Sequence, residues 1–168
     1  KNVCASRSFS EKVTGRQQDI TGTMVNGDDR ALSAAVKGDI HGISYNNLGL
    51  VYDLKTRKVA DSIAIIPIDL DENGHIDGGE NFYGTLDDIL KFLREDGSEL
   101  IPQDDVNIVF NTATVSKEAL GFLQWIITSG QEFNNAYGLL KLNATVSADQ
   151  QARIEALQSN DIIHISKN

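Results

Sequence analysis

Apolar residues recur at helical spacing in several segments, and polar capping residues or glycines flank them. The clearest case begins at Thr85 and runs to about Arg94, where Ile89, Leu90 and Leu93 fall on one side of a helix. Trp125 lies on the apolar face of the longest such segment and is expected in the core. The same signals predict four further helices, over residues 7–13, 28–37, 117–129 and 147–157.

Short runs rich in β-branched residues lie between these helices and predict strands. The strongest run covers residues 62–68, and a second covers 106–110. Weaker candidates are residues 22–25, 42–45 and 163–165. Because strands and helices alternate, the pattern predicts an α/β fold with a mixed or parallel sheet. Residues 1–168 fit a single domain, or one lobe plus part of another.

Composition narrows the class of protein. The chain has 168 residues, 40% of them hydrophobic, and a net charge of −9 with its basic residues scattered singly. Nucleic acid is therefore not expected as a partner, since phosphate backbones attract clustered cations. No apolar run reaches the length of about 18–20 residues that spans a bilayer. The lone Cys4 cannot form an internal disulfide.

The most specific local pattern is Asp-Leu-Asp-Glu-Asn-Gly-His-Ile-Asp-Gly-Gly-Glu over residues 69–80. It has the spacing of a twelve-residue EF-hand loop, in which alternate oxygen-bearing residues surround Ca²⁺ and a central glycine allows a sharp turn. His75 stands where the loop offers a backbone carbonyl, so its imidazole is not expected to be a ligand. The predicted calcium site comprises Asp69, Asp71, Asn73, His75, Asp77 and Glu80.

The surroundings of this loop differ from those of a regular EF-hand. A strand-like segment precedes it, instead of a helix, and no second loop is present to pair with it. The prediction is therefore an isolated EF-hand-like loop with a structural calcium ion, not a regulatory sensor. The alternative is a solvated acidic turn that holds no ion.

Two stretches resemble a known family. Residues 25–45 look like a capped helix followed by an Ile-Gly-Tyr strand, with Ser44 in place of the glycine, and residues 116–131 resemble a late helix. In this order they are similar to the phosphate-binding subunit of bacterial ABC importers. The resemblance implies a lobe of the type II periplasmic-binding-protein fold, with a mixed sheet, flanking helices and the acidic loop as an insertion. It also implies that an upstream lobe would precede Lys1.

What the resemblance implies for function is the binding of inorganic phosphate between two lobes, for delivery to the membrane permease of an importer. The implied location is periplasmic or on the cell surface. The nearest residues usable for the anion are Ser6, Arg7 and Ser8, close to the start of the first helix, where backbone N–H groups favour an anion. The alternative is that a serine caps this helix and Arg7 is a surface charge.

A second functional hypothesis is a calcium-stabilised extracellular interaction module that has a solute-binding-protein fold but no transport role. An enzyme is not expected. The three histidines, His41, His75 and His164, are not at metal-ligand spacing, and the sequence has no phosphate-binding glycine loop or nucleophile elbow. Its carboxylates cluster only in the calcium-type loop.

Overall fold

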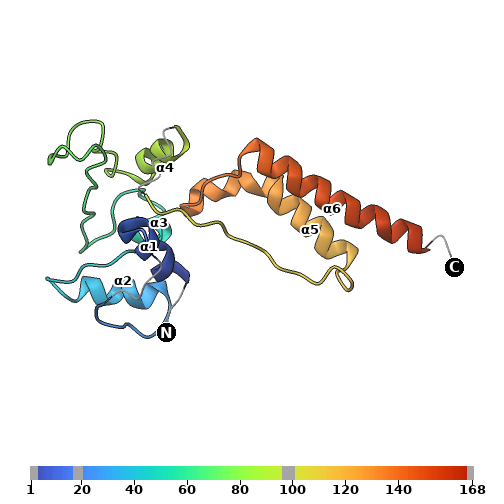
Figure 1. Cartoon of the computed structure of the whole chain (residues 1–168), viewed down its shortest axis with the longest axis horizontal. Coiled ribbons are helices and arrows are strands. Elements are labelled where there is room, and N and C mark those ends of the chain that lie inside the picture. The colour runs from blue at the N-terminus through green and yellow to red at the C-terminus, as the bar shows by residue number, and fades with distance from the viewer. Residues whose placement is uncertain (1–3, 17–20, 96–100, 166–168) are drawn as a thin grey trace. The chain divides into compact units, whose positions relative to one another are not determined.

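The computed structural model of the chain describes residues 4–16, 21–95 and 101–165, apart from the side chains of residues 4–6 and 160–165. Within these residues the fold is helical, with seven helices and no β-strand (Figure 1). The prediction of an α/β fold, and of a type II periplasmic-binding-protein-like lobe with a mixed sheet, is therefore wrong. The helices are α1 (Cys4–Thr14), α2 (Asp29–Lys37), α3 (Leu48–Val51), α4 (Leu86–Glu95), α5 (Lys117–Ile127), the 3₁₀ helix η1 (Ser129–Tyr137) and α6 (Ala144–Ile165).

The segments predicted as strands do not form a ladder because little packs against them. In residues 106–110, Val106 is 81% exposed and Val109 is 93% exposed, and Ile66 in residues 62–68 is 65% exposed. The tendency of β-branched residues to form strands depends on packing against cross-strand neighbours, which these side chains lack. Residues 22–25 and 42–45 are also irregular, and residues 163–165 belong to α6. In the described residues, pairing is limited to isolated bridges such as Tyr52 with Val59.

The helices that begin at a capping residue follow the sequence closely. Asp28 caps α2, and its Oδ1 accepts the backbone N–H groups of Arg30 at 3.1 Å and Ala31 at 3.2 Å. Ser116 caps α5 in the same way, accepting the N–H of Ala119 at 3.2 Å. Gly15 ends the first helix with a φ of +69°, a conformation that glycine adopts without strain. These boundaries confirm the predicted starts of α2 and α5 and the predicted end of α1, whereas α6 extends beyond both ends of the helix predicted over residues 147–157.

The chain divides into two compact units, Lys1–Asp105 and Val106–Asn168. In the first unit the core is centred on α4 and the segment before it, and Tyr52 adds a buried aromatic ring from the end of α3. Phe82 stacks on Phe92, with ring centroids 3.6 Å apart. The buried apolar side chains of this unit are Tyr52, Phe82, Tyr83, Leu86, Ile89, Leu90 and Leu93.

In the second unit, α5 and α6 lie side by side (Figure 1), with Leu120 and Ile154 buried. Ser147 joins the two helices by donating its hydroxyl to the carbonyl of Ile127 at 3.0 Å. Trp125 is 44% exposed, so its expected place in the core is wrong; it stacks on Phe122 at the surface, with centroids 5.9 Å apart. None of the helices in the described ranges is both long enough and apolar enough to cross a bilayer.

Candidate metal centre

The acidic loop brings three carboxylates from distant loop positions to one point. Carboxylate oxygens of Asp69, Asp71 and Glu80 all lie within 4.8 Å of one another. Oxygen atoms that share one Ca²⁺ stand about 2.3–2.6 Å from it, so two such ligands are at most about 5 Å apart. The three side chains therefore meet the distance limit for a common cation.

The turn at the centre of the loop places the first two of these carboxylates. Asp69 accepts the backbone N–H groups of Asn73 at 3.2 Å and Gly74 at 2.7 Å, which folds the chain back over its own start. Asp71 accepts the N–H of Asn73 at 3.1 Å. Gly74 has a φ of +83°, where a side chain would add strain. The glycine that the sequence pattern requires is thus in the expected conformation.

The other predicted ligands lie in the loop but outside this group of carboxylates. Asn73 donates its side-chain amide to Asp71 at 2.9 Å and accepts the N–H of His75 at 2.8 Å. Asp77 accepts the N–H of Gly79 at 3.1 Å. Neither His75 nor Asp77 belongs to the group formed by Asp69, Asp71 and Glu80. The structure thus brings together three of the six residues named from the sequence, and Asn73 adjoins them through Asp71.

Glu80 is the anchor of the loop. It is only 5% exposed, and its Oε1 accepts the backbone N–H groups of Leu70 and of Asp71, the latter at 3.2 Å. Its Oε2 accepts the N–H of Asp77 at 3.2 Å. A carboxylate has about four lone-pair sites, so three are occupied and capacity for a cation remains on Oε2. Glu80 can therefore bind an ion while it holds both halves of the loop together.

Two tyrosines connect the two ends of the loop. The sequence patterns did not indicate a role for either of them. The hydroxyl of Tyr83 accepts the backbone N–H of Ile68, the residue before Asp69, at 3.3 Å. Tyr52 donates its own hydroxyl to the carbonyl of Tyr83 at 2.9 Å. These bonds join the chain entering the loop to the chain leaving it, where a regular EF-hand has a pair of helices. The Phe82-Tyr83 pair directly after the loop is the sequence signal that could have indicated an aromatic anchor.

The buried tyrosines predict a loss of stability at high pH. Burial is the main cause that raises the pKa of Tyr52 to about 12, and burial also raises the pKa of Tyr83, with the charge of Glu80 acting in the same direction. An unfolded tyrosine ionises near its ordinary pKa of about 10. The stability that Tyr52 contributes is therefore fully present below pH 10 and is lost as the pH rises from about 10 to about 12.

We expect the urea midpoint of the chain to fall between pH 9 and pH 11.5, and to fall less in Tyr52→Phe. The matched control is Tyr137→Phe, which removes a hydroxyl from a ring that is 64% exposed and should leave the slope with pH unchanged. An equal slope in the protein and in Tyr52→Phe would contradict the assignment to Tyr52.

The residues expected to contact phosphate lie inside the first helix. Helix α1 begins at Cys4, so Ser6, Arg7 and Ser8 follow its first residues and do not precede it. Arg7 is exposed and Ser8 is half-buried, while the side chain of Ser6 lies outside the described residues. Their role in anion binding stays a prediction.

A cluster of oxygen ligands around one point, without a sulfur or imidazole ligand in the group, suits a hard cation such as Ca²⁺. The distances between these oxygens would allow one cation to bind all three carboxylates. Comparison of the chain with protein-family models, with curated proteins and with solved structures found no match in any of the three.

Proposed function

We propose that this chain is an interaction module stabilised by one calcium ion in the loop from Asp69 to Glu80. The observation that carries the proposal is the convergence of Asp69, Asp71 and Glu80 within 4.8 Å. Three like charges at this distance repel one another, and a divalent cation converts the repulsion into attraction. The ion is structural, because this isolated loop has no entering helix that calcium could rearrange.

Calcium is favoured over magnesium by the shape of the loop. Magnesium requires near-ideal octahedral geometry and gives up its water reluctantly, whereas calcium accepts six to eight oxygens in irregular arrangements. Here Asp71 is exposed and Asp69 is half-buried, so water completes the coordination shell. A site of this kind fits the millimolar calcium found outside the cytoplasmic membrane, which is where we place the module.

The phosphate-importer role is a second hypothesis, and it rests on the sequence resemblance alone. The two helices on which the resemblance depends, α2 and α5, are formed and capped. The sheet that the same resemblance implied is not formed in the described residues. We therefore rank the calcium-stabilised module first.

Calorimetric titration of the metal-free protein with calcium tests the proposal. We expect one ion per chain with a dissociation constant of about 10⁻⁴ M, in the range of extracellular modules. At calcium concentrations about 100 times that value, binding to the folded state adds about 2.7 kcal/mol of stability, which raises Tm by about 5–10 °C. Magnesium at the same concentration should give a much smaller rise. No heat and no shift in Tm, from protein shown to be folded, would favour a solvated acidic turn.

A further inference from the structure

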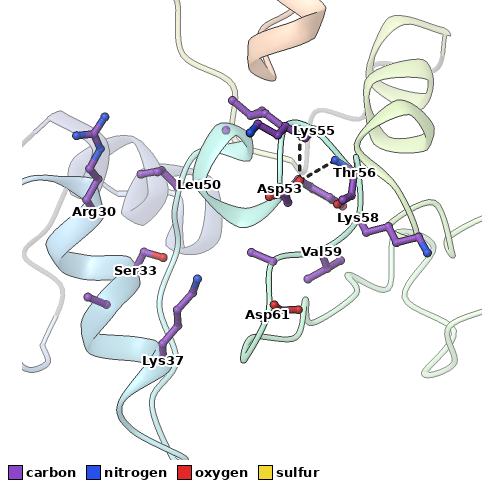
Figure 2. Close-up of a pocket in the computed structure, with 15 residues that line it drawn as sticks. Arg30, Ser33, Lys37, Leu50, Asp53, Lys55, Thr56, Lys58, Val59 and Asp61 are labelled. Carbon is purple, nitrogen blue, oxygen red and sulfur yellow. Dashed lines mark hydrogen bonds between the residues drawn. The ribbon is translucent and has the colours of Figure 1, made fainter.

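A concave groove lies in the first unit, between α2 and the chain from Gly49 to Asp61 (Figure 2). It encloses about 930 Å³. Ser33 and Lys37 extend from α2 towards the facing chain, Arg30 lies at the end of α2, and Lys55 lies at the edge of the facing turn, whereas the side chain of Lys58 points away from α2. A volume near the upper end of the range of about 300–1,000 Å³ for small-molecule sites is much larger than one inorganic oxyanion fills.

The two walls of the groove are tied together. Asn46 donates its side-chain amide to the carbonyl of Asp29 at 2.9 Å, and Asn47 donates to the Asp29 carboxylate at 2.9 Å. Asp29 is the first residue of α2, so these bonds fix that helix against the start of α3. The groove therefore has defined walls that do not depend on the long side chains at its rim.

The facing wall is a tight turn that projects cations. Asp53 donates its backbone N–H to the carbonyl of Lys58 at 2.9 Å, and its Oδ1 accepts the N–H groups of Lys55 at 3.0 Å and Thr56 at 2.7 Å. These N–H bonds lower the pKa of Asp53, so its carboxylate stays ionised and stabilises the turn as a hydrogen-bond acceptor. The turn thus holds Lys55 and Lys58 at fixed backbone positions beside the groove.

The charge of the groove is opposite to that of the whole chain. Four cations line it, Arg30, Lys37, Lys55 and Lys58, against two carboxylates, those of Asp53 and Asp61. The net charge of the chain is −9. Among the described residues none of the four cations forms an ion pair, whereas Arg57 in the same turn pairs with Asp87 at 2.6 Å. The groove therefore carries a local excess of two positive charges, and Asp53 offsets part of the charge of Lys55.

We propose that this groove binds a small organic molecule that carries two or more phosphate groups. Lysine binds phosphate as a point charge, and cations on both walls suit anionic groups separated along a ligand. The hydroxyl of Ser33 supplies a further donor, and the apolar side chains of Leu50 and Val59 provide contact for the organic part. The site is separate from the calcium loop and does not depend on calcium being bound there.

Calorimetry with fructose 1,6-bisphosphate as the probe tests the proposal. Calcium is kept equal in cell and syringe, and a titration without protein corrects for calcium bound by the sugar phosphate. We expect saturable one-to-one binding that weakens as salt is raised, with fructose 6-phosphate and inorganic phosphate each at least about tenfold weaker. Equal affinity for inorganic phosphate, or no saturable heat from folded protein, would overturn the proposal.

Variants then locate the site. The double variant Lys37→Glu/Lys55→Glu changes one exposed cation on each wall and should weaken binding by at least about tenfold, and Lys37→Gln alone by about threefold. The matched control is Lys91→Glu, an exposed lysine on α4 outside the groove, with less than about a twofold effect expected. If Lys91→Glu lost as much affinity for the bisphosphate as the groove variants, the effect would be one of overall charge. That result would overturn the assignment of the site to the groove. Circular dichroism of each variant verifies that it is folded.

Discussion

Replacing Glu80 by glutamine is expected to weaken calcium binding by about 100-fold. Glutamine has nearly the same shape but removes a full negative charge from the group formed with Asp69 and Asp71. Loss of a charged partner at a buried position is worth about 1.5–3 kcal/mol, and about 2.7 kcal/mol corresponds to 100-fold. No other single change in the loop should have as large an effect, since Glu80 is the one buried carboxylate of the three.

Glu80→Gln should also destabilise the loop in the absence of calcium. Both oxygens of Glu80 accept backbone N–H groups, from Leu70 and Asp71 on one side and Asp77 on the other. In glutamine, an NH₂ group takes the place of one carboxylate oxygen and faces a backbone N–H group of the loop. That buried N–H then has no acceptor, which costs about 1–3 kcal/mol of unfolding free energy. The metal-free variant should therefore have a lower Tm than the metal-free protein.

The matched control is Glu72→Gln, which removes the same charge from an exposed position in the same loop. Glu72 is not part of the carboxylate group, so calcium affinity should change by less than about threefold through long-range charge alone. Calorimetry and thermal unfolding of both variants, with and without calcium, give the comparison. Equal losses of affinity in the two variants would mean that the loop attracts calcium as a diffuse acidic surface.

Features set by neighbouring residues were predictable from the sequence. The caps at Asp28 and Ser116 and the apolar face of α4 involve residues at most a few positions apart, so the pattern contains the whole interaction. The spacing of the acidic loop belongs to the same class, because its turn is made by bonds from Asp69 and Asp71 to residues up to five positions later. Local interactions explain why the two caps, the apolar face of α4 and the turn at Gly74 are found as predicted, while calcium binding by the loop stays a prediction.

Features that depend on distant parts of the chain were not predictable. A run such as residues 106–110 has the composition of a strand, but a strand also needs a neighbour, and composition does not specify one. The Tyr52–Tyr83 bond joins residues 31 positions apart, and the groove joins α2 to the turn at Asp53. Nothing in the sequence around either tyrosine indicates the other. The predicted sheet was wrong because strand formation depends on packing between distant segments. Tyr52 and Tyr83 were missed for the same reason, since only the folded chain brings them together.

A large loss of stability is expected for the core substitution Leu90→Ala. Leu90 is 1% exposed in the middle of α4, on the face that also buries Ile89 and Leu93. Truncation removes buried methyl groups and leaves a cavity, which cannot close because neighbouring core residues hold the helix in place. The expected loss of unfolding free energy is about 2–5 kcal/mol. Because alanine has the higher helix propensity, any loss is due to packing and not to the helix itself.

Urea unfolding of Leu90→Ala should show a lower midpoint, equivalent to that loss of unfolding free energy, with little change in the dependence of the free energy on urea concentration. The adjacent substitution Lys91→Ala is the control, since Lys91 is exposed on the same helix and its change should stay within about 0.5 kcal/mol. Leu120→Ala makes the equivalent cavity in the second unit, where Leu120 is also 1% exposed. If Leu90→Ala costs no more than Lys91→Ala, α4 does not form the core of the first unit.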